Sequence, residues 1–111
     1  MDAKSLQKIL KDPKRVLTEL QYADLQNADL QYADLRNADL QNANFDFSCF
    51  PLWCGSFGTR VSKELVYQLA YHICKLNNDD QDVLEIQSFL AEFANKSHIL
   101  TAYNLPKIVE E

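Results

Sequence analysis

The stretch YADLQNADLQYADLRNADLQNANF, residues 22–45, repeats one short pattern every five residues. Each unit holds a small residue, then Asp or Asn, then a large apolar residue. A five-residue period matches neither the period of about 3.6 residues of an α-helix nor the period of about 2 residues of a strand. One small and one large side chain cannot enclose a core within a single unit. We therefore expect the chain to turn after each unit and to stack on itself as a solenoid.

The pattern A-[DN]-[LF]-x-x resembles the pentapeptide-repeat family over about residues 18–51. The resemblance implies a right-handed, four-sided parallel β-helix, in which the large residue and the small residue two positions earlier point inward. The predicted fold class is a short β-solenoid of under two coils, with an N-terminal helix and a C-terminal helical hairpin. The structural core residues that the resemblance implies are Leu25, Leu30, Leu35, Leu40, Phe45 and Phe50.

The segments that flank the repeat divide the rest of the chain. Residues 1–15 are predicted to cap the solenoid with an N-terminal helix, formed by residues 3–11 and followed by Pro13 as a stop. Residues 16–51 are predicted to form the β-helix. Residues 52–61 break the repeat and hold both glycines of the chain, which predicts a junction loop. Residues 62–111 are predicted to be helical, with a loose tail.

Two helices are expected in this C-terminal region, from Ser62 to about Leu76 and over about residues 81–95, followed by a short element at 97–105. The hydrophobic period predicts one apolar face for each helix. The first face contains Val61, Leu65, Val66, Leu69, Ala70 and Ile73, and the second contains Val83, Ile86, Leu90 and Phe93.

The 111-residue chain is acidic, with a net charge of −5. Phosphate neutralisation supplies most non-specific affinity for nucleic acid, so a chain without a basic stripe is a poor direct binder of DNA or RNA. The charge favours a basic protein partner, including one that itself binds nucleic acid. No apolar run approaches the roughly 20 residues that cross a bilayer, and the N-terminus lacks a signal-peptide core. We therefore expect no membrane partner and a cytoplasmic protein in a bacterial host cell.

Catalytic, cofactor and metal chemistry find little support in the sequence. Cys49, Cys54, Cys74 and His72 offer the ligand types of a zinc site, but no CxxC pair occurs. His72 and Cys74 are two residues apart on a predicted helix and do not share a face. No phosphate loop or hydrolase motif is present. We predict free cysteines, no cofactor, no metal site and no enzymatic activity.

Two sets of residues are candidates for partner binding. The aspartates of the repeat are either solvated turn residues or a girdle of negative charge that a basic partner recognises. Tyr22 and Tyr32 lie at outward-facing positions of the repeat. Tyr67 and Tyr71 are either covered because their helix is buried on two sides, or part of an exposed aromatic patch of the kind enriched in interfaces. The candidate partner-binding residues are Asp24, Asp29, Asp34, Asp39, Tyr22, Tyr32, Tyr67 and Tyr71.

The resemblance also suggests what such a protein does. Pentapeptide-repeat proteins are mostly non-enzymatic, and well-understood members mimic DNA and bind DNA gyrase. A solenoid of fewer than two coils is too short to reproduce an extended DNA rod. The layout is similar to small pentapeptide-repeat proteins of phages and prophages in Firmicutes. We expect a protein-binding module that inhibits a basic, nucleic-acid-binding host protein such as a CRISPR effector, with partial DNA mimicry. The alternatives are a gyrase-binding protein, or a structural homodimer formed through the C-terminal helices with no host target.

Overall fold

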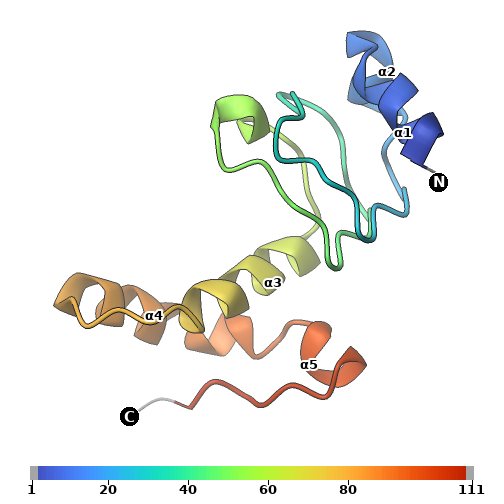
Figure 1. The fold of residues 1–111 in the computed structure, drawn as a ribbon. Coiled ribbons are helices and arrows are strands. Elements are labelled where there is room, and N and C mark those ends of the chain that lie inside the picture. Colours follow the sequence, from blue (N-terminus) through green and yellow to red (C-terminus); the bar gives the residue numbers. More distant parts are fainter. Residues whose placement is uncertain (1–2, 110–111) are drawn as a thin grey trace. The chain divides into compact units, whose positions relative to one another are not determined.

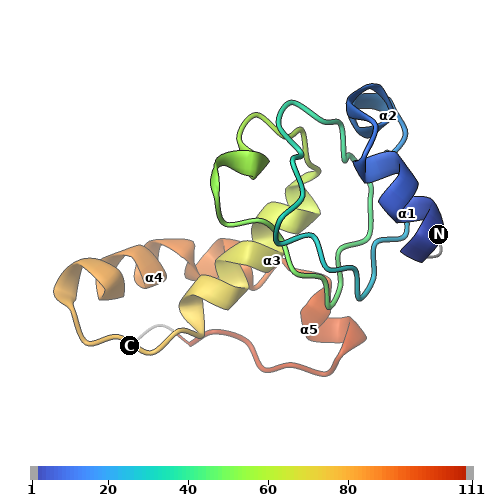
Figure 2. The same ribbon diagram turned by 45° about the horizontal axis from the view of Figure 1, so that its top comes forward.

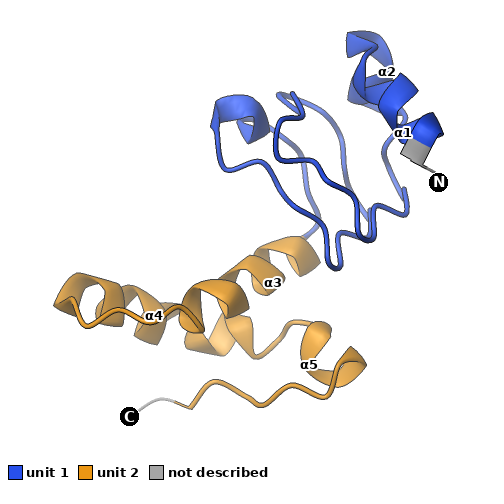
Figure 3. Cartoon of the chain, in the orientation of Figure 1, with its two compact units in different colours: residues 1–62 blue, residues 63–111 orange. Residues whose placement is uncertain are grey.

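A computed structural model describes residues 3–109 of the chain. The chain divides into two compact units, Met1–Ser62 and Lys63–Glu111 (Figure 3). The first unit contains two short helices and the repeat, and the second contains three helices (Figure 1).

The first unit begins with helices α1, Ala3–Leu10, and α2, Pro13–Thr18. Helix α1 buries Leu6 and Ile9 on one face. Helix α1 ends at Leu10, and Pro13 is the first residue of α2, a helix that the sequence pattern did not predict. Proline is tolerated there because its missing N–H costs nothing in the first turn of a helix. The carboxylate of Asp12 caps α2 by accepting a hydrogen bond from the backbone N–H of Lys14 at 3.0 Å.

The large apolar residues of the repeat fill the interior of this first unit. Five leucines, one per unit, are at most 1% exposed: Leu20, Leu25, Leu30, Leu35 and Leu40. Phe45 is also buried, and Phe50 is half-buried with its ring edge-on to that of Phe45, the two centroids 5.7 Å apart. Each fully buried leucine stabilises the fold by roughly 1.5–3 kcal/mol relative to an exposed one.

Backbone segments about twenty residues apart in the repeat lie side by side. Parallel backbone bridges join Asp24 to Asn44 and Asp29 to Cys49. The amide of Leu25 donates to the carbonyl of Asn44 at 2.8 Å, and the amide of Asn44 donates to the carbonyl of Ala23 at 2.9 Å. These bonds stack one turn of the chain on the next.

The prediction of a β-solenoid is nevertheless wrong. Residues 3–109 contain no strand and no sheet, and the repeat runs as coil joined by isolated bridges (Figures 1 and 2). The corners explain this difference, because a positive φ of 60–63° recurs at Tyr22, Asn27, Asn37, Asn42 and Phe47. Residues in the left-handed conformation recur so often along the repeat that they interrupt the extended backbone that a strand ladder requires.

The junction between repeat and second unit contains a short 3₁₀ turn, Cys54–Ser56. A third bridge joins Asp39 to Arg60, 21 positions apart, so the junction adds one residue to the turn of the chain. The Thr59 hydroxyl donates to the carbonyl of Leu35 at 2.8 Å and ties the junction to the repeat.

The second unit consists of helices α3, Lys63–Cys74, α4, Gln81–Ala94, and α5, Ile99–Ala102. Helices α3 and α4 pack side by side. The core of this unit is small and contains Ala70, Tyr71, Ala94 and Ile99, with Cys74, Leu90, Leu100 and Ile108 packed against it.

The C-terminal segment was expected to be loose, but side chains hold it as far as Ile108. The Tyr71 hydroxyl donates to the carbonyl of Pro106 at 2.7 Å. The Asn95 side-chain amide both accepts from the backbone N–H of Ile108 at 2.7 Å and donates to its carbonyl at 3.0 Å. Glu110 and Glu111, the end of the predicted tail, lie outside the described residues.

Candidate protein-binding surface

The four predicted aspartates first of all hold the turns of the repeat. In each, Oδ1 accepts a hydrogen bond from the backbone N–H two residues later, at 3.1–3.2 Å. Such Asx turns replace backbone bonds that the corner leaves unmade. The four aspartates are Asp24, Asp29, Asp34 and Asp39. One oxygen of each carboxylate is therefore engaged within the chain. In Asp29 the second oxygen also accepts a hydrogen bond, from the side-chain amide of Gln31 at 3.2 Å.

Asp34 is further occupied by its neighbour Arg36. The guanidinium donates to Oδ1 at 2.8 Å and to Oδ2 at 2.7 Å, a two-point ion pair. The side-chain hydrogen bonds from Arg36, followed by its backbone N–H, lower the pKa of Asp34 to about 2. This aspartate stays charged at neutral pH, but the adjacent arginine cancels its charge, so the predicted negative girdle is interrupted at this corner.

The four candidate tyrosines fall into two groups. Tyr22 and Tyr32 are 74% and 86% exposed in the first unit. In the second unit, Tyr67 is half-buried with the Lys96 ammonium 6.0 Å from its ring centroid. Tyr71 is buried in the core and bonded to Pro106, so it offers no surface to a partner.

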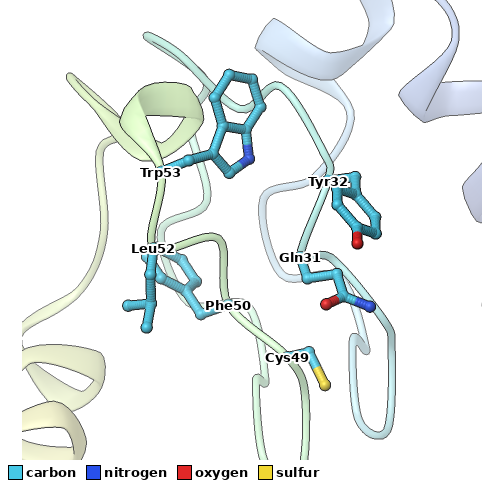
Figure 4. A pocket seen from close by; sticks show the side chains of 6 residues that line it. All are labelled: Gln31, Tyr32, Cys49, Phe50, Leu52 and Trp53. Carbon is cyan, nitrogen blue, oxygen red and sulfur yellow. The ribbon is translucent and has the colours of Figure 1, made fainter.

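An open groove of about 750 Å³ runs beside Tyr32 (Figure 4). Gln31 and Tyr32 come from one unit of the repeat, and four other residues come from the end of the repeat and the junction (Figure 4). The lining is mostly apolar, and Leu52 is 94% exposed. The six lining residues are Gln31, Tyr32, Cys49, Phe50, Leu52 and Trp53.

The Trp53 ring owes its position to Gly55. A methyl group at residue 55 would overlap the Trp53 ring and would lie 2.8 Å from the carbonyl oxygen of Ala33. The missing side chain therefore lets the indole fold back against the chain, where it remains 41% exposed. Glycine is needed here because of this close approach.

A second, more polar hollow of about 460 Å³ meets the groove at Tyr32. Asp29 and Asp34 supply its negative charge, and Lys11 of the loop after α1 supplies a positive one. The residues that line it are Gln7, Leu10, Lys11, Asp29, Tyr32, Ala33 and Asp34. Tyr32 thus separates an apolar groove from a hollow that contains carboxylates.

The cysteines do not form a reactive or metal-binding cluster in the part of the chain that the structure describes. Cys49 and Cys54 are exposed free thiols, and Cys74 is half-buried. Burial raises the pKa of the Cys74 thiol, which disfavours the reactive thiolate. No group of three His, Cys, Asp or Glu residues among the described positions is arranged to hold a metal ion.

Sequence reasoning missed Leu52, Trp53 and the groove that they line with Tyr32. One signal was available, since these residues lie where the repeat pattern fails. A large apolar side chain that no longer follows the inward period has no reason to be buried. The buried Asp46, 4% exposed, was also missed, and the repeat pattern contains no signal for it.

Residues 18–51 match the pentapeptide repeats family, in eight copies. Such repeats are generally found in non-enzymatic proteins. Comparison with curated proteins and with solved structures gave no match. Within the described residues, none of the helices has the length and apolar character that a bilayer crossing requires.

Proposed function

We propose that this chain is a non-enzymatic protein-binding module that inhibits a basic, nucleic-acid-binding protein of a bacterial host, with a CRISPR effector as the favoured example. The groove beside Tyr32 is the contact surface, and the inhibitor acts in the cytoplasm by occupying its target. The observation that carries the proposal is the exposure of Tyr32, Leu52 and Trp53 around one concave surface.

The apolar lining gives the groove its binding energy. A side chain that is 94% exposed, as Leu52 is, gains roughly 1.5–3 kcal/mol when a partner covers it fully. Tyrosine and tryptophan are the residues most enriched among interface hot spots, because they bury large rings at little entropic cost. Trp53, next to Leu52 in the junction, and Tyr32, in the repeat, supply both types to the lining of the groove (Figure 4).

The acidic residues favour a basic partner. The hollow next to the groove contains Asp29, and the chain as a whole carries a net charge of −5. Charges at the edge of an interface mainly raise the association rate and discourage acidic competitors. Because Arg36 neutralises Asp34 and every repeat aspartate also holds a turn, this charge steers a basic protein and resembles DNA only in part.

An affinity capture with three baits tests the proposal. Immobilised wild-type chain, Leu52→Glu and Val109→Glu are incubated with bacterial lysate. Val109 is 80% exposed in the second unit, so its variant matches the charge change without touching the groove. We expect a basic, nucleic-acid-binding protein to be retained by wild type and Val109→Glu and lost with Leu52→Glu. Equal capture by all three baits would contradict the groove as the contact.

Salt separates the two parts of the proposed contact. Exposed charges are screened at high ionic strength, whereas burial of apolar side chains is not weakened by it. We expect capture to decrease with salt but not to vanish. A supercoiling assay tests the gyrase alternative separately. If gyrase still supercoils DNA normally with the chain present at micromolar concentration, this alternative is excluded.

A further inference from the structure

Two side chains that line the groove of the first unit carry polar hydrogens with no acceptor in the described chain. Neither the indole N–H of Trp53 nor the hydroxyl of Tyr32 bonds to any of residues 3–109. In Figure 4 the nitrogen edge of the Trp53 ring is turned toward Tyr32. An indole nitrogen donates and never accepts. Once a partner covers the groove and removes the water, it must therefore supply hydrogen-bond acceptors to these two groups.

The rest of the lining offers little to a hydrogen-bond donor. Phe50 is half-buried and Leu52 is 94% exposed, and neither side chain carries a polar atom. The side-chain N–H₂ of Gln31 is turned to Asp29, where it donates to Oδ2 at 3.2 Å. A backbone N–H that lies against apolar side chains loses its hydrogen bond to water and gains none in return. The groove therefore favours an occupant that is rich in carbonyl oxygens and poor in N–H groups.

This requirement separates the three regular conformations of a peptide. A helix uses its backbone carbonyls in its own hydrogen bonds and has few left for Trp53 and Tyr32. A strand presents free carbonyls together with free N–H groups, which this lining leaves unpaired. A polyproline II helix makes no internal hydrogen bonds, so its carbonyls stay available. Proline also lacks the backbone N–H. A proline-rich segment in this conformation thus meets both conditions.

The size and the aromatic character of the groove agree with such a segment. The groove has a volume of about 750 Å³ and is open to solvent along its surface, as a site for an extended chain must be. The rings of Tyr32 and Trp53 stand apart from each other in it (Figure 4). Proline-rich segments dock in aromatic-lined grooves because their preformed helix loses little entropy on binding.

We propose that the groove of the first unit binds a proline-rich segment in the polyproline II conformation. Carbonyl oxygens of the segment accept hydrogen bonds from the indole of Trp53 and the hydroxyl of Tyr32, and its proline rings cover Leu52. This inference rests on the proposed function, because it names the part of the target protein that enters the groove.

NMR of the ¹⁵N-labelled full chain, titrated with acetylated decaproline, tests the proposal. Trp53 is the single tryptophan, so the spectrum contains one indole N–H signal. We expect this signal to move downfield as the hydrogen bond forms and to saturate with a dissociation constant below about 1 mM. A peptide of ten alternating Gly and Ser residues has the same number of carbonyls but keeps its N–H groups, and it should leave the signal in place.

Three variants locate the contact, with fluorescence anisotropy of labelled decaproline as the readout. Tyr32→Phe removes one donor and should raise the dissociation constant at least about threefold. Tyr22→Phe is the matched control, since Tyr22 is 74% exposed in the same unit but does not line the groove, and it should bind as wild type does. Leu52→Glu should abolish binding. Circular dichroism checks that each variant keeps the wild-type spectrum.

An indole signal that decaproline leaves unchanged at several millimolar would overturn the proposal. Equal affinity of Tyr22→Phe, Tyr32→Phe and Leu52→Glu would overturn it as well.

The peptide titration and the capture experiment can fail separately. If a basic protein is captured through Leu52 but decaproline does not bind, the proposed function stands and the inference about the segment is wrong. If decaproline binds and no basic protein is captured, the groove remains a site for proline-rich segments and the proposed function is wrong.

Discussion

At the scale of single residues, the repeat depends on one fully buried leucine in each unit. Leu35 is 0% exposed, so truncating it leaves a cavity that the neighbouring coil cannot easily fill. We expect Leu35→Ala to lower the free energy of unfolding of the first unit by about 2–5 kcal/mol. Leu52→Ala removes the same atoms from a side chain that is 94% exposed and should cost less than about 0.5 kcal/mol.

Urea unfolding followed by Trp53 fluorescence measures this difference, because Trp53 is the single tryptophan and lies in the first unit. Equal midpoints for Leu35→Ala and Leu52→Ala would contradict a packed repeat interior.

Gly55 controls the position of the indole that lines the groove. Gly55→Ala forces the Trp53 ring to move, since the added methyl group would overlap it. We expect a red-shifted emission and stronger quenching by acrylamide. Gly58→Ala is the control for strain in the junction: with φ at 74° the added methyl group strains the backbone and overlaps the Asn37 side chain, but it does not meet the indole. If Gly55→Ala leaves the quenching of Trp53 unchanged, the described position of the ring is wrong.

The ion pair between Asp34 and Arg36 should make the stability of the folded chain depend on pH. Because the pKa of Asp34 in the folded chain is lowered from 3.8 to about 2, the pair stabilises the fold above the ordinary value and loses that contribution as pH falls toward 2. The side chain is exposed, so the gain in stability is small. A carboxyl ¹³C titration should give a midpoint near 2 in the wild type and a higher one in Arg36→Gln. Identical midpoints in the two proteins would exclude the pair as the cause.

At the scale of elements, the side chain of Asn95 ties the end of the chain to α4. Its Oδ1 accepts a hydrogen bond from the backbone N–H of Ile108 at 2.7 Å, which protects this amide from exchange, and its Nδ2 donates to the carbonyl of Ile108 at 3.0 Å. We expect Asn95→Ala to raise the hydrogen-exchange rate of the Ile108 amide by at least about tenfold, which corresponds to about 1.4 kcal/mol. Asn77→Ala, at an exposed position of the preceding loop, should not change it. An unchanged rate in Asn95→Ala would mean that the tail is held by other contacts.

The sequence predicts these elements unevenly, and the repeat shows why. A five-residue period locates the side chains that the structure buries, from Leu20 to Leu40, since only those positions can face inward together. It does not report backbone conformation. The left-handed corners at Asn27 and Asn37 turn the chain so often that single bridges replace a ladder, and a strand prediction therefore fails.

For the helices, the sequence predicts the backbone conformation better than the side chains that are buried. Their period predicts helices near the observed ends of α3 and α4, but it cannot choose which face is buried. The predicted face of α3 contains Leu65 and Ala70, which the structure buries, but also Val66 and Ile73, which it leaves exposed. The structure also buries Tyr71, which lies outside the predicted face. Tyr71 finds a hydrogen-bond acceptor in Pro106, 35 residues later, and small residues such as Ala70 and Ala94 allow close packing. Neither condition can be seen in the local sequence.

The candidate site was even less accessible to prediction. Pattern alone suggested the aspartates, yet each is engaged in a turn, and Asp34 also binds Arg36. The groove depends on Leu52 and Trp53, which have no periodic position and are brought to Tyr32 only by the return of the chain after twenty residues.

At the scale of the whole molecule, the proposed contact surface belongs to the first unit of an acidic chain with a net charge of −5. Because the proposed inhibitor occupies its target, we expect its effect to be stoichiometric.

The central claim is that the groove blocks a nucleic-acid-binding protein, and a competition measurement tests it directly. Fluorescence anisotropy follows a labelled DNA or RNA ligand bound to the captured protein while the chain is added. Wild type and Val109→Glu should release the nucleic acid at stoichiometric amounts, and Leu52→Glu should not. If the nucleic acid stays bound at saturating wild-type chain, the proposed inhibition is wrong.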